Sequence, residues 1–115
     1  MVDDDDHVRK FIVLVLHDHG YRTLAASNGD DGLRLFREHA SVVDLVLSDL
    51  EMPRLSGAEL APQILALKPS VQLAFITGMT STPLPRDLAS IPVLHKPFTA
   101  TALAAFVSER LGTSH

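Results

Sequence analysis

Hydrophobic residues follow two alternating spacings along this chain. Short runs rich in Val, Ile and Leu predict buried strands, and the stretches between them place apolar residues three and four positions apart, as amphipathic helices do. This alternation is typical of parallel βαβ units whose sheet is covered by helices on both faces. The predicted strands are residues 21–26, 43–48, 71–76 and 91–95, preceded by a short first element, Met1-Val2, and the predicted helices are residues 7–19, 30–39, 56–67 and 99–111.

Local signals set several of the element boundaries. Gly20 follows the last apolar residue of the first helix and suits the position just past a helix end. Ser56 and Glu59 have the spacing of a capping box, which predicts a helix start. Residues 79–90 contain two prolines and little helical periodicity, so we expect a loop with at most a short helix near residues 86–89.

Composition limits the classes of protein that the chain can belong to. Its 115 residues, 46% of them hydrophobic, predict one domain over residues 1–115 with its own core. The net charge of −4 and the absence of a Lys/Arg cluster argue against direct contact with nucleic acid. No apolar run is long enough to cross a membrane, and there are no cysteines for disulfides or thiolate metal sites, so we expect a cytoplasmic protein. Six scattered histidines are interpreted as surface residues that bind no metal: His7, His17, His19, His39, His95 and His115.

Polar residues that can carry chemistry lie at or just past the ends of predicted strands. They are Asp3-Asp4, Asp49, Thr77 and Lys96. In an open parallel sheet the binding crevice lies at the carboxyl ends of the strands, near the topological switch point, so these side chains should converge. Three carboxylates in one crevice repel one another unless a cation is present, and a hard divalent cation such as Mg²⁺ fits this set of oxygen ligands.

A carboxylate beside Mg²⁺ can attack phosphorus and form an aspartyl phosphate. The charge on a transferring phosphoryl group calls for a cation and a hydrogen-bond donor placed beforehand, which Lys96 and Thr77 can supply beside Asp49. Each residue alone has an ordinary interpretation, because acidic runs often begin solvated helices and most lysines lie on the surface. The combination, in this order along the chain, favours a phosphoryl-binding site.

Five segments together resemble the receiver domain family of the response regulators of two-component signalling, over nearly the whole chain. They are Val2-Asp3-Asp4-Asp5, Asp44-Leu45-Val46-Leu47-Ser48-Asp49-Leu50-Glu51-Met52-Pro53, Gly57, Ile76-Thr77-Gly78 and His95-Lys96-Pro97-Phe98. The resemblance implies a flavodoxin-like, doubly wound α/β fold with a parallel five-stranded sheet in the order 2-1-3-4-5, an order for which a chemotaxis protein of this family is a standard example. Here the first strand is expected to be truncated and the fourth helix short or absent.

The resemblance also implies a role for each acidic residue. Asp49 is similar to the phosphoacceptor, Asp4 to a direct Mg²⁺ ligand, Asp3 to a ligand through water, and Glu51 to a ligand through its backbone carbonyl. Four consecutive aspartates leave a second register open, in which Asp4 and Asp5 form the acidic pair.

The remaining site residues are also assigned by resemblance. Thr77 resembles the switch hydroxyl that moves toward the phosphate, and Lys96 the cation that pairs with it. The Lys96-Pro97 bond resembles the family's cis peptide. The position three residues before the lysine, usually aromatic in the family's switch, is Val93. With the shortened proline-rich segment, this departure resembles receivers attached to hybrid histidine kinases.

The truncated first strand has its own implication. Only Met1 and Val2 precede the acidic pair, and losing buried residues from a central strand costs stability. Either the chain is trimmed or another segment fills the position, such as a partner chain or a strand exchanged in a homodimer.

The predicted function is a phosphorelay switch that receives a phosphoryl group from a sensor histidine kinase, a histidine phosphotransfer protein or a small phosphodonor. It is not predicted to be a metabolic enzyme, beyond assisting its own phosphorylation and dephosphorylation. The first alternative is a pseudo-receiver, an interaction module that is never phosphorylated. A phosphohydrolase with an aspartate nucleophile is less favoured, because that chemistry commonly uses a second aspartate two residues after the first, where this chain has Glu51.

Overall fold

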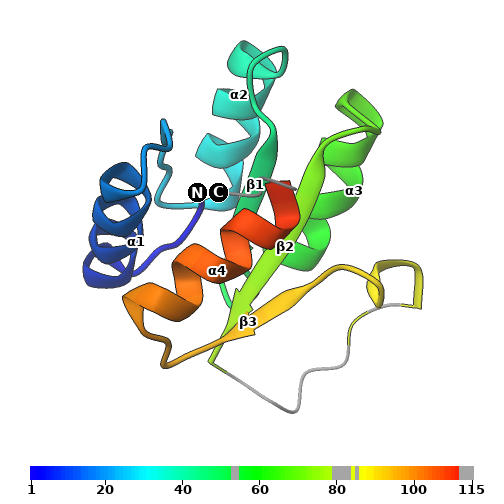
Figure 1. The fold of residues 1–115 in the computed structure, drawn as a ribbon. Coiled ribbons are helices and arrows are strands. Elements are labelled where there is room, and N and C mark those ends of the chain that lie inside the picture. The colour runs from blue at the N-terminus through cyan, green and yellow to red at the C-terminus, as the bar shows by residue number, and fades with distance from the viewer. Residues whose placement is uncertain (53–54, 79–83, 85, 112–115) are drawn as a thin grey trace.

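The computed structural model describes residues 1–52, 55–78, 84 and 86–111. Along this part of the chain, helices alternate with strands as the hydrophobic pattern predicts (Figure 1). The elements are α1 (Asp6–Asp18), α2 (Gly29–His39), β1 (Leu45–Asp49), α3 (Gly57–Leu67), β2 (Gln72–Thr77), the short 3₁₀ helix η1 (Arg86–Leu88), β3 (Val93–His95) and α4 (Ala100–Leu111). Among these described helices, none is long and apolar enough to cross a membrane.

The sheet is parallel and its strands run in the order β1-β2-β3. Val2 extends it by one position, because this residue forms parallel bridges with Ser48 on one side and Ala26 on the other. The resulting order, from Ala26 through Val2 to β1, β2 and β3, is the predicted order 2-1-3-4-5. The truncated first strand is confirmed.

The prediction of a regular strand over residues 21–26 is wrong, because only Ala26 of this segment forms a bridge with the sheet. A strand needs hydrogen-bonding neighbours along its length, and the only ladder partner that the structure gives this segment is Val2, opposite Ala26. In the described structure, three strands and the two single residues Val2 and Ala26 therefore occupy the five strand positions of the sheet.

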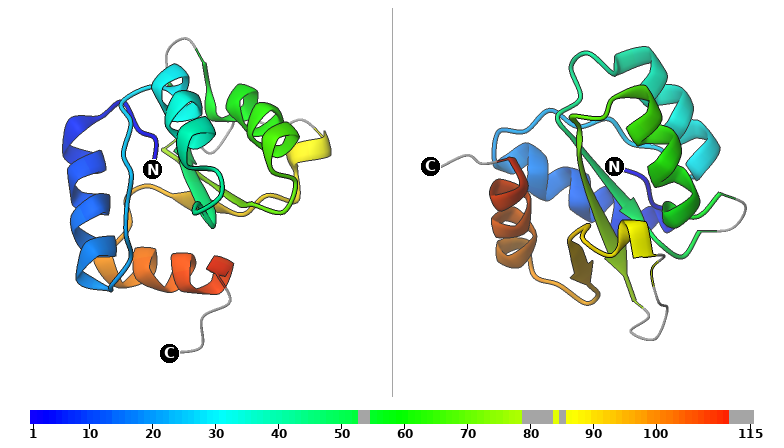
Figure 2. Two further views of the ribbon diagram at one scale, coloured as in Figure 1. Left: turned by 90° about the horizontal axis from the view of Figure 1, so that it is seen from above. Right: turned by 90° about the vertical axis from the view of Figure 1, so that its right-hand side faces the viewer.

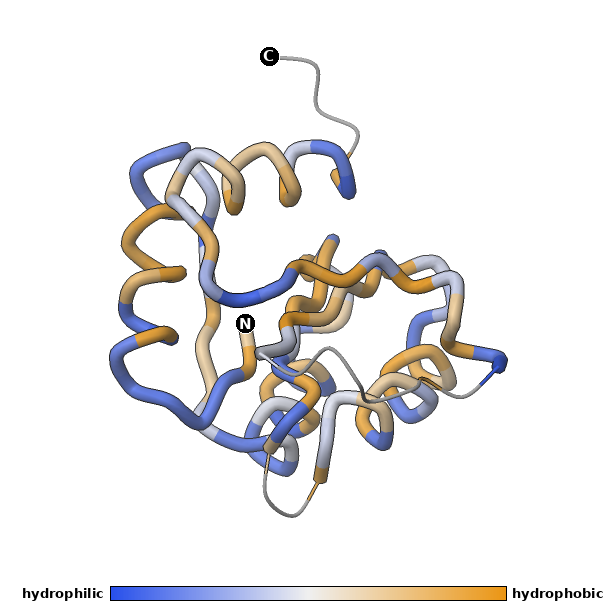
Figure 3. The backbone as a smooth tube through the Cα atoms, turned by 90° about the horizontal axis from the view of Figure 1, so that it is seen from below, coloured by the Kyte–Doolittle hydropathy of each residue, from blue (hydrophilic) through white to orange (hydrophobic). Residues whose placement is uncertain are grey.

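Helices cover both faces of the sheet, α1 and α4 on one and α2 and α3 on the other (Figure 2). Residues Ile12, Leu16 and Leu103 of α1 and α4 pack in one apolar cluster with alternate residues of the strands, and α2 and α3 pack on the other face. Figure 3 shows the same pattern along the backbone, with largely hydrophobic strands at the centre and helices of mixed polarity around them. Burial on both faces explains why the strand sequences are continuous apolar runs.

The helix boundaries follow the local signals in the sequence. The side chain of Asp5 caps α1 by accepting a hydrogen bond from the backbone N–H of His7 at 2.9 Å. Gly20 follows the end of this helix with a φ of 85°, a conformation that glycine adopts without steric cost. The capping box of Ser56 and Glu59 is present in both directions at 3.2 Å, as predicted.

The connection between β2 and β3 contains η1, whose Leu88 is buried in the core. This agrees with the expected short or absent fourth helix. Four residues used in the sequence predictions lie outside the described part of the chain: Pro53, Pro83, Pro85 and His115.

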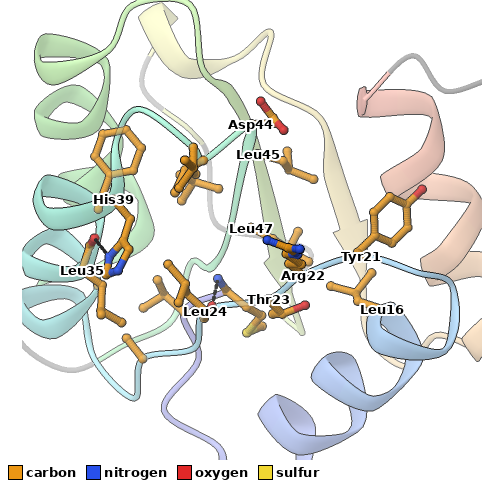
Figure 4. Close-up of a pocket in the computed structure, with 18 of the residues that line it drawn as sticks. Leu16, Tyr21, Arg22, Thr23, Leu24, Leu35, His39, Asp44, Leu45 and Leu47 are labelled. Carbon is orange, nitrogen blue, oxygen red and sulfur yellow. Dashed lines mark hydrogen bonds between the residues drawn. The ribbon is translucent and has the colours of Figure 1, made fainter.

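A pocket of about 720 Å³ opens beside Met1 and Val2 (Figure 4). It lies between residues 20–24 and the side of β1 that carries Leu45 and Leu47. None of the predicted site residues lines this pocket. It is therefore a space within the sheet layer and is separate from the acidic cluster.

Candidate functional site

The backbone brings the predicted acidic residues to one edge of the sheet. The N–H of Val2 donates to the carbonyl of Leu47 at 2.8 Å, and the N–H of Asp49 donates to the carbonyl of Val2 at 2.9 Å. This parallel pairing places Asp3 beside the end of β1. Carboxylate oxygens of Asp3, Asp4 and Asp49 all lie within 4.8 Å of one another.

Asp3 is fully buried, with 0% of its surface exposed. One of its carboxylate oxygens, Oδ1, accepts a hydrogen bond from the N–H of Asp5 at 2.9 Å. The other, Oδ2, is buried with no hydrogen-bond partner in the described structure, and the Nζ of Lys96 lies 3.6 Å from it. A buried carboxylate oxygen in this state has unused capacity to bind a cation.

The side chain of Asp5 points to the helix and not to the cluster. Its Oδ1 accepts from the backbone N–H groups of His7 and Val8 and so caps α1. Asp4, by contrast, is exposed and contributes an oxygen to the cluster. The geometry therefore favours the Asp3-Asp4 register over Asp4-Asp5.

Lys96 supplies positive charge to the cluster. Its Nζ donates to Oδ2 of Asp49 at 3.0 Å, while the other oxygen of Asp49, Oδ1, accepts from the N–H of Glu51 at 3.0 Å. The backbone N–H of Lys96 bonds to the carbonyl of Thr77 at 2.8 Å, which places the lysine next to the end of β2. The Lys96–Pro97 peptide bond is cis.

The pKa values of the buried groups reflect this arrangement. Burial raises the pKa of the Asp3 carboxyl from 3.8 to about 6, and the negative charge of Asp49 adds to the effect, while the Asp5 amide and Lys96 oppose it. Burial alone would lower the pKa of Lys96. The hydrogen bond to Asp49 and the charges of Asp49 and Asp3 outweigh it, so the pKa of Lys96 is raised. The ammonium group is thus charged at neutral pH, and Asp3 ionises only at some cost.

The side chain of Glu51 was missed by the sequence predictions, which used only its backbone carbonyl. Oε1 of Glu51 accepts a hydrogen bond from the Thr77 hydroxyl at 2.6 Å and another from the N–H of Gly78 at 2.9 Å. The only signal in the sequence is a charged residue two positions after Asp49, and nothing in the sequence shows which way its side chain turns.

The structure also places Val93 and the described histidines that the sequence analysis considered. Val93 begins β3 and is half-buried. Of the described histidines, His39 is half-buried and the others are exposed, and no histidine belongs to the one group of residues in the described structure that could hold a metal.

The comparisons with known proteins agree with this geometry. The model of the response regulator receiver domain family matches residues 1–108. The chain is a receiver domain of the response regulators.

Similar proteins include receivers in two settings. The chain is 32% identical to the sensor kinase CckA of Brucella abortus, over 96% of this chain but only 12% of the kinase, and 33% identical to the response regulator receiver protein CpdR of the same organism, over 85% of this chain and 82% of CpdR. A crystal structure of the receiver domain from the hybrid histidine kinase CckA superposes with a TM-score of 0.83 at 29% identity, covering 96% of this chain and 94% of that domain. The predicted likeness to receivers of hybrid kinases agrees with these matches.

The receiver's acidic cluster fits a magnesium ion. Mg²⁺ prefers oxygen ligands, and the cluster offers carboxylates from Asp3, Asp4 and Asp49. The buried Oδ2 of Asp3, which lacks a hydrogen-bond partner in the described structure, is the kind of atom that a bound cation or its water shell would satisfy. The donor set is thus suited to a hard divalent cation.

Replacing Asp3 with asparagine should stabilise the receiver in metal-free buffer at neutral pH. Because the folded-state pKa of Asp3 is raised to about 6, folding is penalised once the carboxyl ionises, and this penalty grows from about pH 4 and is complete above about pH 6. Asp3→Asn should therefore raise the free energy of unfolding by on the order of 2 kcal/mol at pH 7.5, with the difference disappearing toward pH 4. Urea denaturation across this pH range measures it.

The matched control is Asp44→Asn, which removes the same charge from an exposed position just before β1. It should change stability little at any of these pH values. An Asp3→Asn protein no more stable than wild type at pH 7.5 would show that the buried carboxylate carries no penalty.

Proposed function

We propose that this receiver accepts a phosphoryl group on the carboxylate of Asp49. The observation that carries the proposal is the Lys96 ammonium 3.0 Å from Asp49, within a cluster that also contains Asp3 and Asp4. A strand-end carboxylate beside a cation and two further acidic groups has the parts that phosphoryl transfer to aspartate requires.

In the proposed reaction an oxygen of Asp49 forms a bond to phosphorus as the bond from phosphorus to the donor breaks. With phosphohistidine the broken bond is P–N, and the departing imidazole keeps the electron pair and takes up a proton. With acetyl phosphate it is P–O, and acetate departs. Lys96 and the Thr77 hydroxyl then hold the negative oxygens of the phosphoryl group.

Access to Asp49 requires a movement of neighbouring side chains. Asp49 is only 2% exposed, whereas 25% of the Lys96 side chain is exposed and Asp4 lies on the surface. A rotation of the Lys96 side chain, which has four rotatable bonds, opens the carboxylate to a phosphodonor and later lets the ammonium bind the phosphoryl oxygens.

The proposed Mg²⁺ site consists of Asp4 and Asp49 as direct ligands, Asp3 through water, and the backbone carbonyl of Glu51. When bound, the ion would offset the charges of the cluster and of the phosphoryl oxygens. The described residues support this assignment through the three carboxylates and through the position of Glu51, whose N–H bonds to Asp49.

The proposed phosphodonor is a sensor histidine kinase or a histidine phosphotransfer protein, and the proposed output is a change in partner binding. The domain would act as a switch, with slow chemistry on its own aspartate, and not as an enzyme that turns over a metabolite. The named relatives, a sensor kinase and a receiver protein, support this role.

Intact mass after incubation with acetyl phosphate and Mg²⁺ tests the acceptor. We expect wild type and the exposed-position control Asp44→Asn to gain one phosphate, and Asp49→Asn, which keeps the shape of the side chain, to gain none. Addition of EDTA should abolish the gain. A wild-type protein that stays unmodified under these conditions would instead be a pseudo-receiver.

Two neighbouring substitutions test the metal register. Asp4→Asn should raise the dissociation constant for Mg²⁺ at least tenfold, because it removes a charged ligand. Asp5→Asn should leave it nearly unchanged, because asparagine caps a helix about as well as aspartate does. Isothermal titration calorimetry measures both, and the reverse pattern would place the acidic pair at Asp4 and Asp5.

A further inference from the structure

The carboxylate of Glu51 binds two hydrogen-bond donors at the edge of the sheet. Oε1 accepts from the Thr77 hydroxyl at 2.6 Å and from the N–H of Gly78 at 2.9 Å. Both bonds have a charged acceptor, which makes them stronger than bonds between neutral groups. This contact links the loop after β1 to the end of β2, 26 residues further along the chain.

The same two donors lie next to the phosphoacceptor. In the register of the sheet Asp49 is paired with Ile76, so the next two residues are Thr77, which ends β2, and Gly78, which follows it. The N–H of Leu50 bonds to the carbonyl of Ile76 at 2.9 Å, which keeps the two strand ends together. A phosphoryl group on Asp49 would need donors in this position, because its oxygens carry spread negative charge.

Glu51 therefore presents to Thr77 and Gly78 what a phosphoryl group would present, a negatively charged oxygen. One hydroxyl proton cannot be donated to both acceptors at once. The Glu51 carboxylate and a phosphoryl group on Asp49 would also repel each other, because both are negative. The site is partly buried, so water screens this repulsion less than it does at the surface.

We propose that the Glu51 carboxylate is an internal competitor for the phosphoryl group, and that it must release Thr77 and Gly78 before the phosphorylated state can form. The inference rests on the proposed phosphorylation of Asp49 and deepens it, since it names a residue that sets how readily that site is occupied. Glu51 then has two separate roles: its backbone carbonyl belongs to the metal site, and its side chain stabilises the unphosphorylated state.

The consequence is a shift in the balance between two states. The contacts of Glu51 with Thr77 and Gly78 stabilise only the unphosphorylated state. Removing the Glu51 side chain should therefore increase the affinity for a phosphoryl group by the free energy of these contacts. The expected gain is about tenfold, the scale of one hydrogen bond to a charged group.

Binding of beryllofluoride, a mimic of the aspartyl phosphoryl group, tests the competition. It can be followed in the presence of Mg²⁺ by ¹H–¹⁵N NMR titration. Glu51→Ala should bind it about tenfold more tightly than wild type. Glu51→Gln should show a smaller gain, because its amide oxygen still accepts from Thr77. Glu38→Ala, which removes a charge from an exposed position of α2, is the control and should bind as wild type does.

The pairing with Thr77 separates competition from a simple change of charge. In a Thr77→Val background, which keeps the shape of the side chain and removes the hydroxyl, the gain from Glu51→Ala should fall at least threefold. An equal gain in both backgrounds, or no gain in wild type, would overturn the inference. Urea denaturation of each variant shows whether it folds, and the change in the Gly78 amide shift on Glu51→Gln gives a second readout of the contact.

This design distinguishes the two proposals. If wild type binds beryllofluoride at Asp49 and the Glu51 variants bind it equally well, the competition fails and the phosphoacceptor stands. If neither wild type nor any variant binds it, the proposed function fails and the competition fails with it.

Discussion

The ion pair between Lys96 and Asp49, with Asp3 3.6 Å from the same ammonium, is the interaction on which the site depends. Two aspartates at the buried end of a sheet would repel each other and be costly to ionise without a positive charge. Lys96 provides that charge from the end of β3. Its contacts therefore also hold this segment next to Asp3 at the start of the chain and Asp49 at the end of β1. Burial raises the pKa of Asp3 although Lys96 opposes the shift, and the bond to Asp49 helps to raise the pKa of Lys96 against the effect of burial.

Val2 makes the arrangement possible through its backbone. Its backbone bonds to Leu47 and Asp49 on one side. On the other side, its neighbours Met1 and Asp3 bond to Ala26, so Asp3 lies between two other parts of the sheet. One residue thus carries the role that a full strand has elsewhere in the sheet. The pocket beside Met1 and Val2 lies where the sheet contains only this short first segment and no full strand (Figure 4).

Much of this architecture could be predicted because it depends on local rules. Apolar runs, the capping box at Ser56 and Gly20 at a helix end placed most elements within a few residues. The convergence of Asp3, Asp49 and Lys96 followed from the rule that the carboxyl ends of parallel strands lie at the same edge of the sheet.

The strand predicted over residues 21–26 is absent for a physical reason. The composition of the segment is suited to a strand, but a strand forms only along a neighbouring strand, and the sequence does not show how far that neighbour extends. The Glu51 contact could not be predicted either, since it depends on a side-chain rotamer between segments far apart in sequence. The sequence also left two registers open for the acidic pair, and both the capping role of Asp5 and the place of Asp3 in the cluster favour Asp3-Asp4.

The central claim is that Asp3-Asp4, Asp49 and Lys96, which are far apart in the sequence, form one pocket. In this pocket Lys96 and Mg²⁺ offset the negative charge, and Asp49 can accept a phosphoryl group. A crystal structure with Mg²⁺ and beryllofluoride tests it most directly. We predict beryllofluoride on the carboxylate of Asp49, in contact with Lys96 and the Thr77 hydroxyl, with the metal bound by Asp4, Asp49 and the carbonyl of Glu51. A metal bound away from these residues, or crystals soaked to saturation with Asp49 still paired to Lys96 and unmodified, would contradict the account.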